Sequence, residues 1–355
     1  MKKSIFFMAG CAVALASCTQ TDVLEEGVQS SAIGFENAVS KESRALTNTS
    51  LNKFYVYGYY TQAGLEGNPV SVFDGEPVSL ADGSWGYTNT RYWVPGATYY
   101  FYAYSCENNA VTNASAGLDL EGDNVAERAL TIDGYTANSS HQHDLIFATN
   151  DNGIIGKDTD NAKVAFTFKH ILSRVNVKFT SEFAAGYDIV VKDVKLENIV
   201  DKGNFDPAGT TWSGFSRTVE QTETEATQIL LSVPADGNVA SKAIPASEGV
   251  EGVAEKTVTT GNGYVIPVQY QNSHVRLVFD IEVKQGNDVM LARTLSGSWQ
   301  PKWVAGMGYT YNVKISGDAA NLDPIVFETS ENMNLDGWNT GNTDAVEMNF
   351  NFSAN

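Results

Sequence analysis

Cys18 is the residue whose setting most clearly predicts a chemical reaction. The chain starts with the basic Met1-Lys2-Lys3, continues with a nearly unbroken apolar run over residues 5–16, and reaches Cys18 through small residues. That run is shorter than the about 20 residues that span a bilayer, but it has the length of a signal-peptide core. A cysteine thiol at this place can accept diacylglycerol, and several acyl chains give lasting membrane attachment. We therefore predict a signal peptide over residues 1–17, lipidation of Cys18 and anchoring in the cell outer membrane. The alternative is an ordinary secretory signal with an incidental cysteine.

Two histidines one residue apart, His141 and His143, could hold a metal ion from an extended segment. The sequence has 4 His in all, and the other two, His170 and His274, are distant in sequence, so no third ligand is evident. A place on a surface turn is therefore the stronger interpretation of the pair. His170 falls inside a strand pattern, and we expect it to be packed rather than to act as a base.

An acidic segment is the second metal candidate. Asp119, Glu121 and Asp123 have the alternate spacing of calcium ligands, but the Gly and the terminal Glu of an EF-hand loop are missing. A solvated acidic loop is the stronger interpretation. The sequence also contains no P-loop, dinucleotide or serine-hydrolase motif. We predict no enzymatic activity, no metal and no cofactor.

Composition limits the classes of partner and the ways in which the fold can be stabilised. The 355 residues carry a net charge of −19, which argues against a nucleic-acid partner because phosphate binding needs Lys and Arg. Aromatic residues make up 11 %, enough for a substantial core. Of the 3 cysteines, Cys11 leaves with the signal and Cys18 is lipidated, so Cys106 has no partner for a disulfide. Burial of the core must therefore stabilise the fold.

Short segments with alternating apolar and polar residues recur from Leu51 onward. This period of two is typical of half-buried antiparallel strands, and the Tyr-rich segments 54–60 and 99–104 have strand composition. No 3.6-residue period is sustained, so the predicted class is all-β, in sandwiches. The expected faces are Val164, Phe166 and Phe168; Val175, Val177 and Phe179; Val275, Leu277, Phe279, Ile281 and Val283; and Tyr309, Tyr311, Val313 and Ile315, with Thr310, Asn312, Lys314 and Ser316 opposite the last set.

The chain divides into four segments by composition. After the signal peptide of residues 1–17, residues 18–50 are mostly polar and are interpreted as a lipidated tether. Within this tether, the alternation in Ala32-Ile33-Gly34-Phe35 could add one strand to the edge of a domain. An Asp-, Asn- and Gly-rich stretch near residue 160 separates an N-terminal sandwich over 51–160 from a C-terminal sandwich over 161–355.

The order of motifs resembles that of the fimbrillins, the Mfa-like and FimA-like pilin subunits of anaerobic gut and oral bacteria. The resemblance spans nearly the whole chain. It implies two tandem transthyretin-like β-sandwiches and a structural subunit of a cell-surface fimbria, or pilus, that binds other fimbrial subunits and supports adhesion to a host or bacterial surface ligand. The matching motifs are the lipobox at Cys18, 54–58, Tyr92-Trp93-Val94-Pro95-Gly96, 100–104, Asp144-Leu145-Ile146-Phe147-Ala148, 166–175, Gly203-Asn204-Phe205 with Trp212, Val265-Ile266-Pro267, Trp303-Val304-Ala305-Gly306 and Gly337-Trp338-Asn339.

The resemblance also implies an assembly route. Prepilins of this kind travel as lipoproteins, and a protease cuts after an arginine and removes the first strand of the N-terminal domain. Here Arg44-Ala45 lies between the tether and the segment 54–60, and Ile33 to Phe35 lies upstream of it. A cut at Arg44 would remove the lipid and that strand together, and a strand from a neighbour would fill the groove by β-augmentation. The alternative is that Arg44 is an exposed linker arginine.

The last residues offer a donor strand. Val346, Met348, Phe350 and Phe352 alternate strictly with polar residues. Such a strand could leave its own domain and fill the groove of a neighbour. The alternative, preferred for an isolated protomer, is that it stays paired at home as an edge strand.

Two other functions remain open at this point. A surface lipoprotein could bind glycans through exposed Trp85, Trp93 or Trp212, although tryptophans more often pack in cores or under loops. An anchored adhesin that never polymerises would keep residues 19–44 in its mature form.

Overall fold

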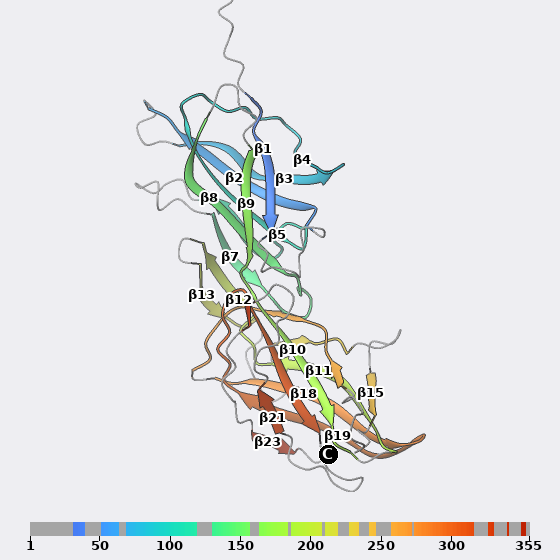
Figure 1. Cartoon of the computed structure of the whole chain (residues 1–355). Coiled ribbons are helices and arrows are strands. Elements are labelled where there is room, and N and C mark those ends of the chain that lie inside the picture. Colours follow the sequence, from blue (N-terminus) through green and yellow to red (C-terminus); the bar gives the residue numbers. More distant parts are fainter. Residues whose placement is uncertain are drawn as a thin grey trace, which may run out of the picture.

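The computed structural model describes residues 31–39, 51–63, 69–118, 130–156, 163–183, 186–207, 210–218, 227–233, 241–245, 257–271, 273–315, 326–329, 339–340 and 349–352. Every regular element in this part of the chain is a strand, which confirms the all-β class (Figure 1). The strands are β1 (Gly34–Val39), β2 (Lys53–Thr61), β3 (Val70–Ala81), β4 (Ser84–Gly86), β5 (Thr98–Cys106), β6 (Ser115–Leu118), β7 (Leu130–Thr136), β8 (Leu145–Ile155), β9 (Lys163–His170), β10 (Ser173–Ser181), β11 (Asp188–Glu197), β12 (Lys202–Asp206), β13 (Thr211–Ser216), β14 (Gln228–Leu230), β15 (Ser241–Pro245), β16 (Thr257–Thr259), β17 (Gly263–Val265), β18 (Val275–Gln285), β19 (Asp288–Trp299), β20 (Met307–Ile315), β21 (Val326–Thr329), β22 (Asn339–Thr340) and β23 (Asn349–Phe352). None of the described residues forms a helix that is long and apolar enough to cross a membrane.

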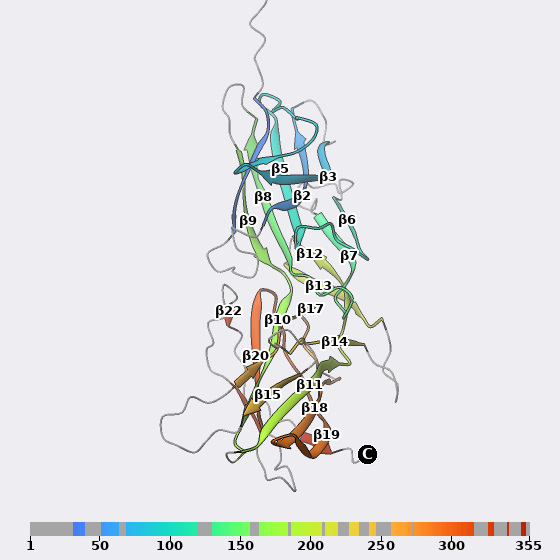
Figure 2. The ribbon, with the colours of Figure 1, turned by 90° about the vertical axis from the view of Figure 1, so that its right-hand side faces the viewer.

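The strands form four sheets, two in each half of an elongated molecule (Figure 1). The first half contains a seven-stranded sheet in the order β1-β9-β8-β5-β2-β3-β4 and a four-stranded sheet in the order β13-β12-β7-β6. Figure 2 shows the four-stranded sheet beside the lower part of the larger one. The second half contains the sheet β16-β10-β20-β21, to which β17 and β22 add, and the sheet β14-β11-β18-β19-β23, to which β15 adds.

The seven-stranded sheet is covered by apolar residues on both faces. One face carries a Phe-rich cluster that includes Phe35, Phe54, Phe101 and Phe166. The other face carries a Tyr-rich cluster, in which tyrosines of β2 and β5 meet Phe205 and other residues of the four-stranded sheet. The long strands β2 and β5 therefore bury side chains in both directions, which explains their dense run of aromatic residues.

The predicted alternation of buried and exposed residues is confirmed for the main strands. In β9, exposed and buried positions alternate from Lys163 to His170, and the predicted inward faces of β10 and β18 are buried. On β20, Tyr309, Tyr311, Val313 and Ile315 are all buried. These faces of β10, β18 and β20 belong to one continuous core in the second half.

Two expectations for β20 were wrong. Thr310 was expected on the solvent side but is 5 % exposed, and its register partner Asn176 is also buried. The Asn176 side chain donates to Asn262 Oδ1 at 3.3 Å, which gives this buried amide a partner. The pairing direction also differs, since β10 and β20 are parallel rather than antiparallel.

The domain boundary near residue 160 stays a prediction, and the strand pairings add detail around it. β9, which follows that point, belongs to the seven-stranded sheet, and the later β12–β13 hairpin pairs with β7. Two buried residues, Ile171 and Leu172, connect β9 with β10 of the second half. Three strands from beyond residue 160 thus complete the sheets of the first half.

Candidate strand-docking groove

Strand β1 lies along one edge of the seven-stranded sheet. It runs parallel to β9, in a register that places Gly34 opposite Lys163 and Val39 opposite Phe168. The alternation in residues 32–35 predicted an edge strand here, and the structure confirms it. The parallel direction could not be read from that alternation, because a period of two is common to both directions.

A second wall of the groove is formed by residues 87–93, which we call the Tyr87 loop. The Ile33 N–H donates to the carbonyl oxygen of Arg91 at 2.8 Å, and the Trp93 N–H donates to that of Ser31 at 3.0 Å. These bonds flank an antiparallel bridge between Ala32 and Tyr92. The segment that leads into β1 is therefore hydrogen-bonded to the Tyr87 loop, and β1 itself pairs with β9.

The side chain of Tyr87 adds a third contact to the backbone of this segment. Its hydroxyl donates to the Ile33 carbonyl oxygen at 2.8 Å and accepts from the Arg91 N–H at 3.1 Å. Burial raises the pKa of Tyr87, an effect that the hydrogen bond from Arg91 partly offsets, so the hydroxyl remains a donor at neutral pH. Arg91 in turn holds the loop on β3, since its Nε donates to the Val72 carbonyl oxygen at 3.2 Å.

Two side chains of the strand segment fill the groove. Ile33 is 1 % and Phe35 is 2 % exposed, while the next residue, Glu36, is exposed to solvent. The Phe35 ring has five aromatic neighbours, with centroids 5.3–6.2 Å away. Four of these pairs have the edge-on geometry that aromatic rings prefer, and the fifth is stacked. We call this set the Phe35 pocket; its rings are those of Phe54, Phe73, Tyr87, Phe101 and Phe166.

The C-terminal segment pairs within its own half of the molecule. β23 is antiparallel to β19, with Phe350 opposite Gly297 and Phe352 opposite Leu295. It occupies the edge of its own sheet, which is the arrangement expected above for an isolated protomer. Val346 and Met348 lie outside the described residues, and so do Cys18, Arg44 and Ala45, for which lipidation and cleavage stay predictions.

The histidines and the cysteine lie in settings that a structural role explains. His170 is buried, as predicted, with Nδ1 2.9 Å from Oδ1 of the buried Asp144. His143 pairs with Glu107 at 2.9 Å on a partly exposed surface. In the part of the chain that the structure describes, no three His, Cys, Asp or Glu side chains gather to hold a metal. Burial raises the pKa of the Cys106 thiol to about 12, despite the opposing contact with Tyr135, so the thiol stays protonated.

The tryptophans proposed for glycan stacking do not form an open aromatic platform. Trp93 is 1 % and Trp212 is 8 % exposed, and Trp85 is partly buried against the Phe-rich cluster. The indole N–H of Trp212 donates to the Ile171 carbonyl oxygen at 2.7 Å. These side chains pack the first half, as the more common role of tryptophan predicts.

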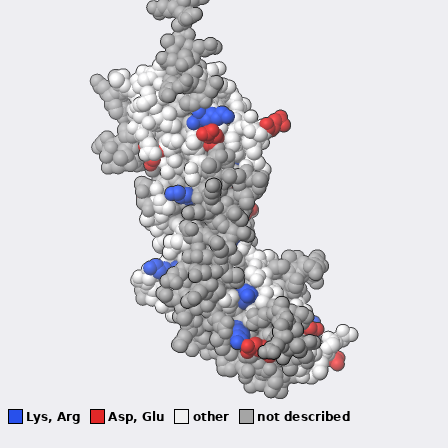
Figure 3. Space-filling view, viewed as in Figure 1, with Lys and Arg blue, Asp and Glu red and all other residues white. Residues whose placement is uncertain are grey.

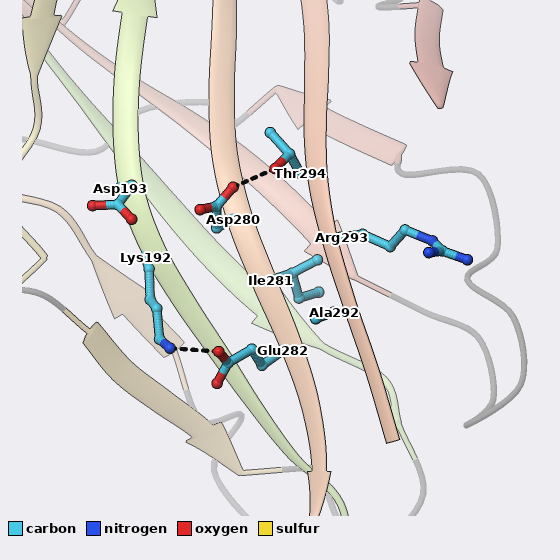
Figure 4. Close-up of a pocket in the computed structure, with 8 residues that line it drawn as sticks. All are labelled: Lys192, Asp193, Asp280, Ile281, Glu282, Ala292, Arg293 and Thr294. Carbon is cyan, nitrogen blue, oxygen red and sulfur yellow. Dashed lines mark hydrogen bonds and ion pairs between the residues drawn. The ribbon is translucent and has the colours of Figure 1, made fainter. Parts of the chain in front are cut away.

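A shallow pocket of about 400 Å³ lies on the outer face of β11, β18 and β19 (Figure 4). Its polar side chains are largely paired with one another. Lys192 meets Glu282 at 2.6 Å, and Thr294 donates to Asp280 at 2.6 Å. Arg293 points away from the others in Figure 4. These internal pairs leave no convergent set of groups that would orient a small ligand.

That nucleic acid is not a partner stays a prediction. On the face in Figure 3, the described Lys and Arg side chains lie apart from one another, among uncharged and acidic residues. Phosphate binding uses basic side chains that are gathered along a surface.

The fold and the groove define a class of protein: an all-β chain of stacked sheets with an inserted edge strand. A model of the fimbrillin-like family matches residues 43–331, which is most of the sequence, and the chain belongs to that family. Fimbrillin-like proteins are fimbrial structural subunits and adhesins rather than enzymes, which confirms the prediction of no catalysis.

One curated relative and two solved structures illustrate the similarity. Fimbrium subunit Fim1C of Phocaeicola vulgatus is 26 % identical over 249 residues, which cover 63 % of this chain and 65 % of that protein. The match thus spans less than two thirds of the length of the relative. A candidate cell adhesion protein from Bacteroides ovatus has a TM-score of 0.45 and 13 % identity, over 85 % of this chain and 96 % of its own. The fimbrial anchor protein Mfa2 from Porphyromonas gingivalis has a TM-score of 0.34 and 10 % identity, over 84 % of this chain and 97 % of its own.

Proposed function

We propose that this protein is a structural subunit of a cell-surface fimbria. It would be exported as a lipoprotein anchored in the outer membrane through Cys18, join its neighbours by strand exchange, and support adhesion. Family membership supports the fimbrial role. The observation that carries the mechanism is β1 itself, a strand from the N-terminal tether region whose Phe35 ring lies among the five rings of the Phe35 pocket.

The place of β1 in the chain makes it removable by one cut. Ile33 and Phe35 lie upstream of Arg44, and the body of the first half resumes with the buried Leu51. Cleavage after Arg44 would separate the lipid at Cys18 and the strand from everything downstream. The same event would free the subunit from its tether and leave an apolar groove to be filled.

The energy of refilling such a groove is sufficient for a durable joint. A hydrogen bond contributes about 1 kcal/mol net, and a fully buried large apolar side chain contributes about 1.5–3 kcal/mol. A donor with four apolar residues, as in Val346, Met348, Phe350 and Phe352, can therefore offset the entropy of ordering and of association. β-Augmentation supplies affinity through the backbone and specificity through alternate side-chain pockets.

Two variants test the mechanism on cells that express the full chain. Arg44→Ala should leave a lipid-anchored monomer, because β1 stays covalently attached and occupies the groove. Deletion of residues 346–355 should give a cleaved subunit that cannot join a neighbour. Lys41→Ala, three residues before the proposed cut, is the matched control and should assemble like the parent.

The measurement is a cross-linking ladder from surface extracts on mild SDS gels, with mass spectrometry of the mature N-terminus. Ladders as long as those of the parent from either variant would reject strand exchange by this segment. A mature parent chain that still contains residues 19–44 would instead indicate an anchored adhesin.

A further inference from the structure

We propose that the Phe35 pocket is the specificity pocket of the groove and that it takes Phe350 from a second copy of this chain, with Met348 at the site of Ile33. The inference rests on the proposed function and adds to it a register and a recognition residue. It also assigns Tyr87 as the side chain that closes the pocket and holds the backbone of the occupant.

The direction proposed for the occupant is that of β1 and of the residues that lead into it. The β9 edge pairs with a parallel strand, and the Tyr87 loop pairs with an antiparallel one. Because the two walls run in opposite directions relative to each other, one strand direction satisfies both. A reversed strand would instead have to pair antiparallel to β9 and parallel to the Tyr87 loop, with new sets of hydrogen bonds on both walls.

The pocket demands an aromatic ring at one position. Each of the five surrounding rings is within 6.2 Å of the Phe35 ring between centroids, so a smaller side chain would leave a void. Replacing a large buried side chain by a smaller one lowers stability in such packed sites, because the surrounding residues relax only partly into the cavity. Phe350 and Phe352 are the two aromatic residues of the candidate donor segment.

The neighbouring site distinguishes these two phenylalanines. With Phe350 in the pocket, Met348 falls at the site of Ile33, and an unbranched apolar side chain of similar size adapts to that enclosed space. With Phe352 in the pocket, Phe350 would fall at the site of Ile33, which is 1 % exposed and shaped for a smaller residue. Overpacking a closed site is unfavourable, so the first register is preferred.

The backbone sites of the groove accept the preferred register. Asn349 would replace Gly34, where an added Cβ lies 3.2 Å from Cγ of Lys163, a flexible side chain that can shift. Asn351 would replace Glu36, which is exposed. The segment contains no proline, so the N–H of Met348 can donate to the Arg91 carbonyl oxygen while its own carbonyl oxygen accepts from Tyr87.

Tyr87 links the two forms of recognition. Its ring packs on Phe35 at 5.6 Å and on Phe73 at 5.2 Å between centroids, while its hydroxyl binds the backbone two residues before the pocket position. An occupant therefore makes both contacts with Tyr87, to its ring and to its hydroxyl, when an aromatic residue lies two positions after the residue whose carbonyl oxygen Tyr87 binds.

Tyr87→Phe should shorten the lifetime of the joint about fivefold, the effect of one lost hydrogen bond. Tyr57→Phe is the control, because it also loses a hydroxyl-to-carbonyl bond, to Ala116 at 2.8 Å, on the opposite face.

Cysteine cross-linking reads the register directly. Asn351→Cys is combined in the full chain with one other cysteine substitution, and oxidised surface extracts are run without reductant. Ala165 lies opposite Glu36 in the groove, and Lys163 lies opposite Gly34. With Phe350 in the pocket, the thiol introduced by Asn351→Cys should join that of Ala165→Cys in the next copy and give a ladder, whereas Lys163→Cys should not. Ser296→Cys, opposite Asn351 in the home position, should give an intramolecular bond that marks unexchanged chains.

A slip of the register provides the decisive test. Phe350→Ala should shift the donor by two residues so that Phe352 enters the pocket. The cysteine of Asn351→Cys should then cross-link with that of Lys163→Cys and no longer with that of Ala165→Cys. Phe352→Ala should leave the cross-link with Ala165→Cys unchanged. Equal ladders from both positions in the parent, or no transfer in Phe350→Ala, would overturn the pocket assignment and leave strand exchange standing. If neither Ala165→Cys nor Lys163→Cys gave a ladder in the parent background, the pocket assignment and strand exchange would both be overturned.

Discussion

At the scale of single residues, Phe35 joins a segment of the tether to the centre of the first half. The alternation of Ile33 and Phe35 was sufficient to predict an edge strand. The sequence could not show the five rings around Phe35, because Phe54, Phe73, Tyr87, Phe101 and Phe166 come from strands and loops far apart in the chain. It likewise could not show that Tyr87 binds the strand backbone, since a tyrosine between turn residues carries no pattern.

Phe35→Ala should lower the free energy of unfolding of the uncleaved chain by about 3–5 kcal/mol, the usual cost of replacing a buried phenylalanine by alanine. The physical reason is the loss of contacts with the five rings of the pocket. Urea unfolding followed by near-ultraviolet circular dichroism gives the change. Glu36→Ala, at the exposed next position, should stay close to the parent, and equal losses from the two variants would contradict the docking of β1 described above.

Glu197 should make the second half sensitive to acid. Partial burial raises its pKa, but hydrogen bonds from Lys195 and Arg276 outweigh that effect and leave the pKa below its ordinary value of 4.5. Its contribution to stability is therefore present above pH 4.5 and is lost as the pH falls below that value through the lowered pKa.

The expected result for Glu197→Gln is a destabilised protein at pH 7 whose difference from the parent shrinks below about pH 4.5. Thermal unfolding between about pH 7 and pH 3 measures it. Glu282→Gln also breaks ion pairs, with Lys192 and Lys284, but at a more exposed carboxylate, so its effect should be smaller. A difference between Glu197→Gln and parent that is independent of pH would reject this assignment.

At the scale of elements, alternation predicted which side of a strand faces the core but not its partner. β9, β18 and β20 were found from this pattern because each buries one row of large apolar side chains. The parallel pairs β1–β9 and β10–β20 are long-range contacts that leave no local signal. The burial of Thr310 and Asn176 was missed for a related reason: alternation shows on which side of a strand a residue lies, but not whether that side is exposed.

Val313→Asp on β20 should destabilise the second half by several kcal/mol, because Val313 is 0 % exposed and the new carboxylate would have no partner in the core. Lys314→Gln is the control on the outer face, where the Lys314–Glu182 ion pair is largely solvated and contributes at most about 1 kcal/mol. Melting temperatures compare the two, and coincident melting curves would show that the facing of β20 is wrong.

At the scale of the whole molecule, the two halves are joined more closely than a linker near residue 160 suggests. β12 and β13 return from the second part of the chain to the first half, where Phe205 and Trp212 pack in the Tyr-rich cluster. Composition could locate a polar stretch near residue 160. It could not predict that the β12–β13 hairpin joins a sheet of the first half, because the sequence of a hairpin does not indicate which sheet it pairs with.

The anchor is also a property of the whole chain. Cys18→Ala should abolish labelling by a fatty-acid analogue and leave unprocessed precursor, because no thiol remains at the position that accepts the lipid. Metabolic labelling followed by immunoprecipitation measures this. Cys106→Ala removes a buried thiol that is 2 % exposed and should label like the parent. Undiminished labelling of Cys18→Ala would refute the lipid site.

The continuity of β9 and β10 has a mechanical consequence. Ile171 and Leu172 alone separate the two strands, which follow one another from the first half into the second in Figure 1. In the proposed fibre, tension along the axis would travel through this continuous length of backbone, together with the crossings from β11 to β12 and from β13 to β14. Hydrogen bonds between strands lie roughly across the pulling direction, so neighbouring strands would have to slide and break many bonds together rather than peel apart one at a time. Such shear loading would make each subunit tougher against flow than its equilibrium stability alone implies.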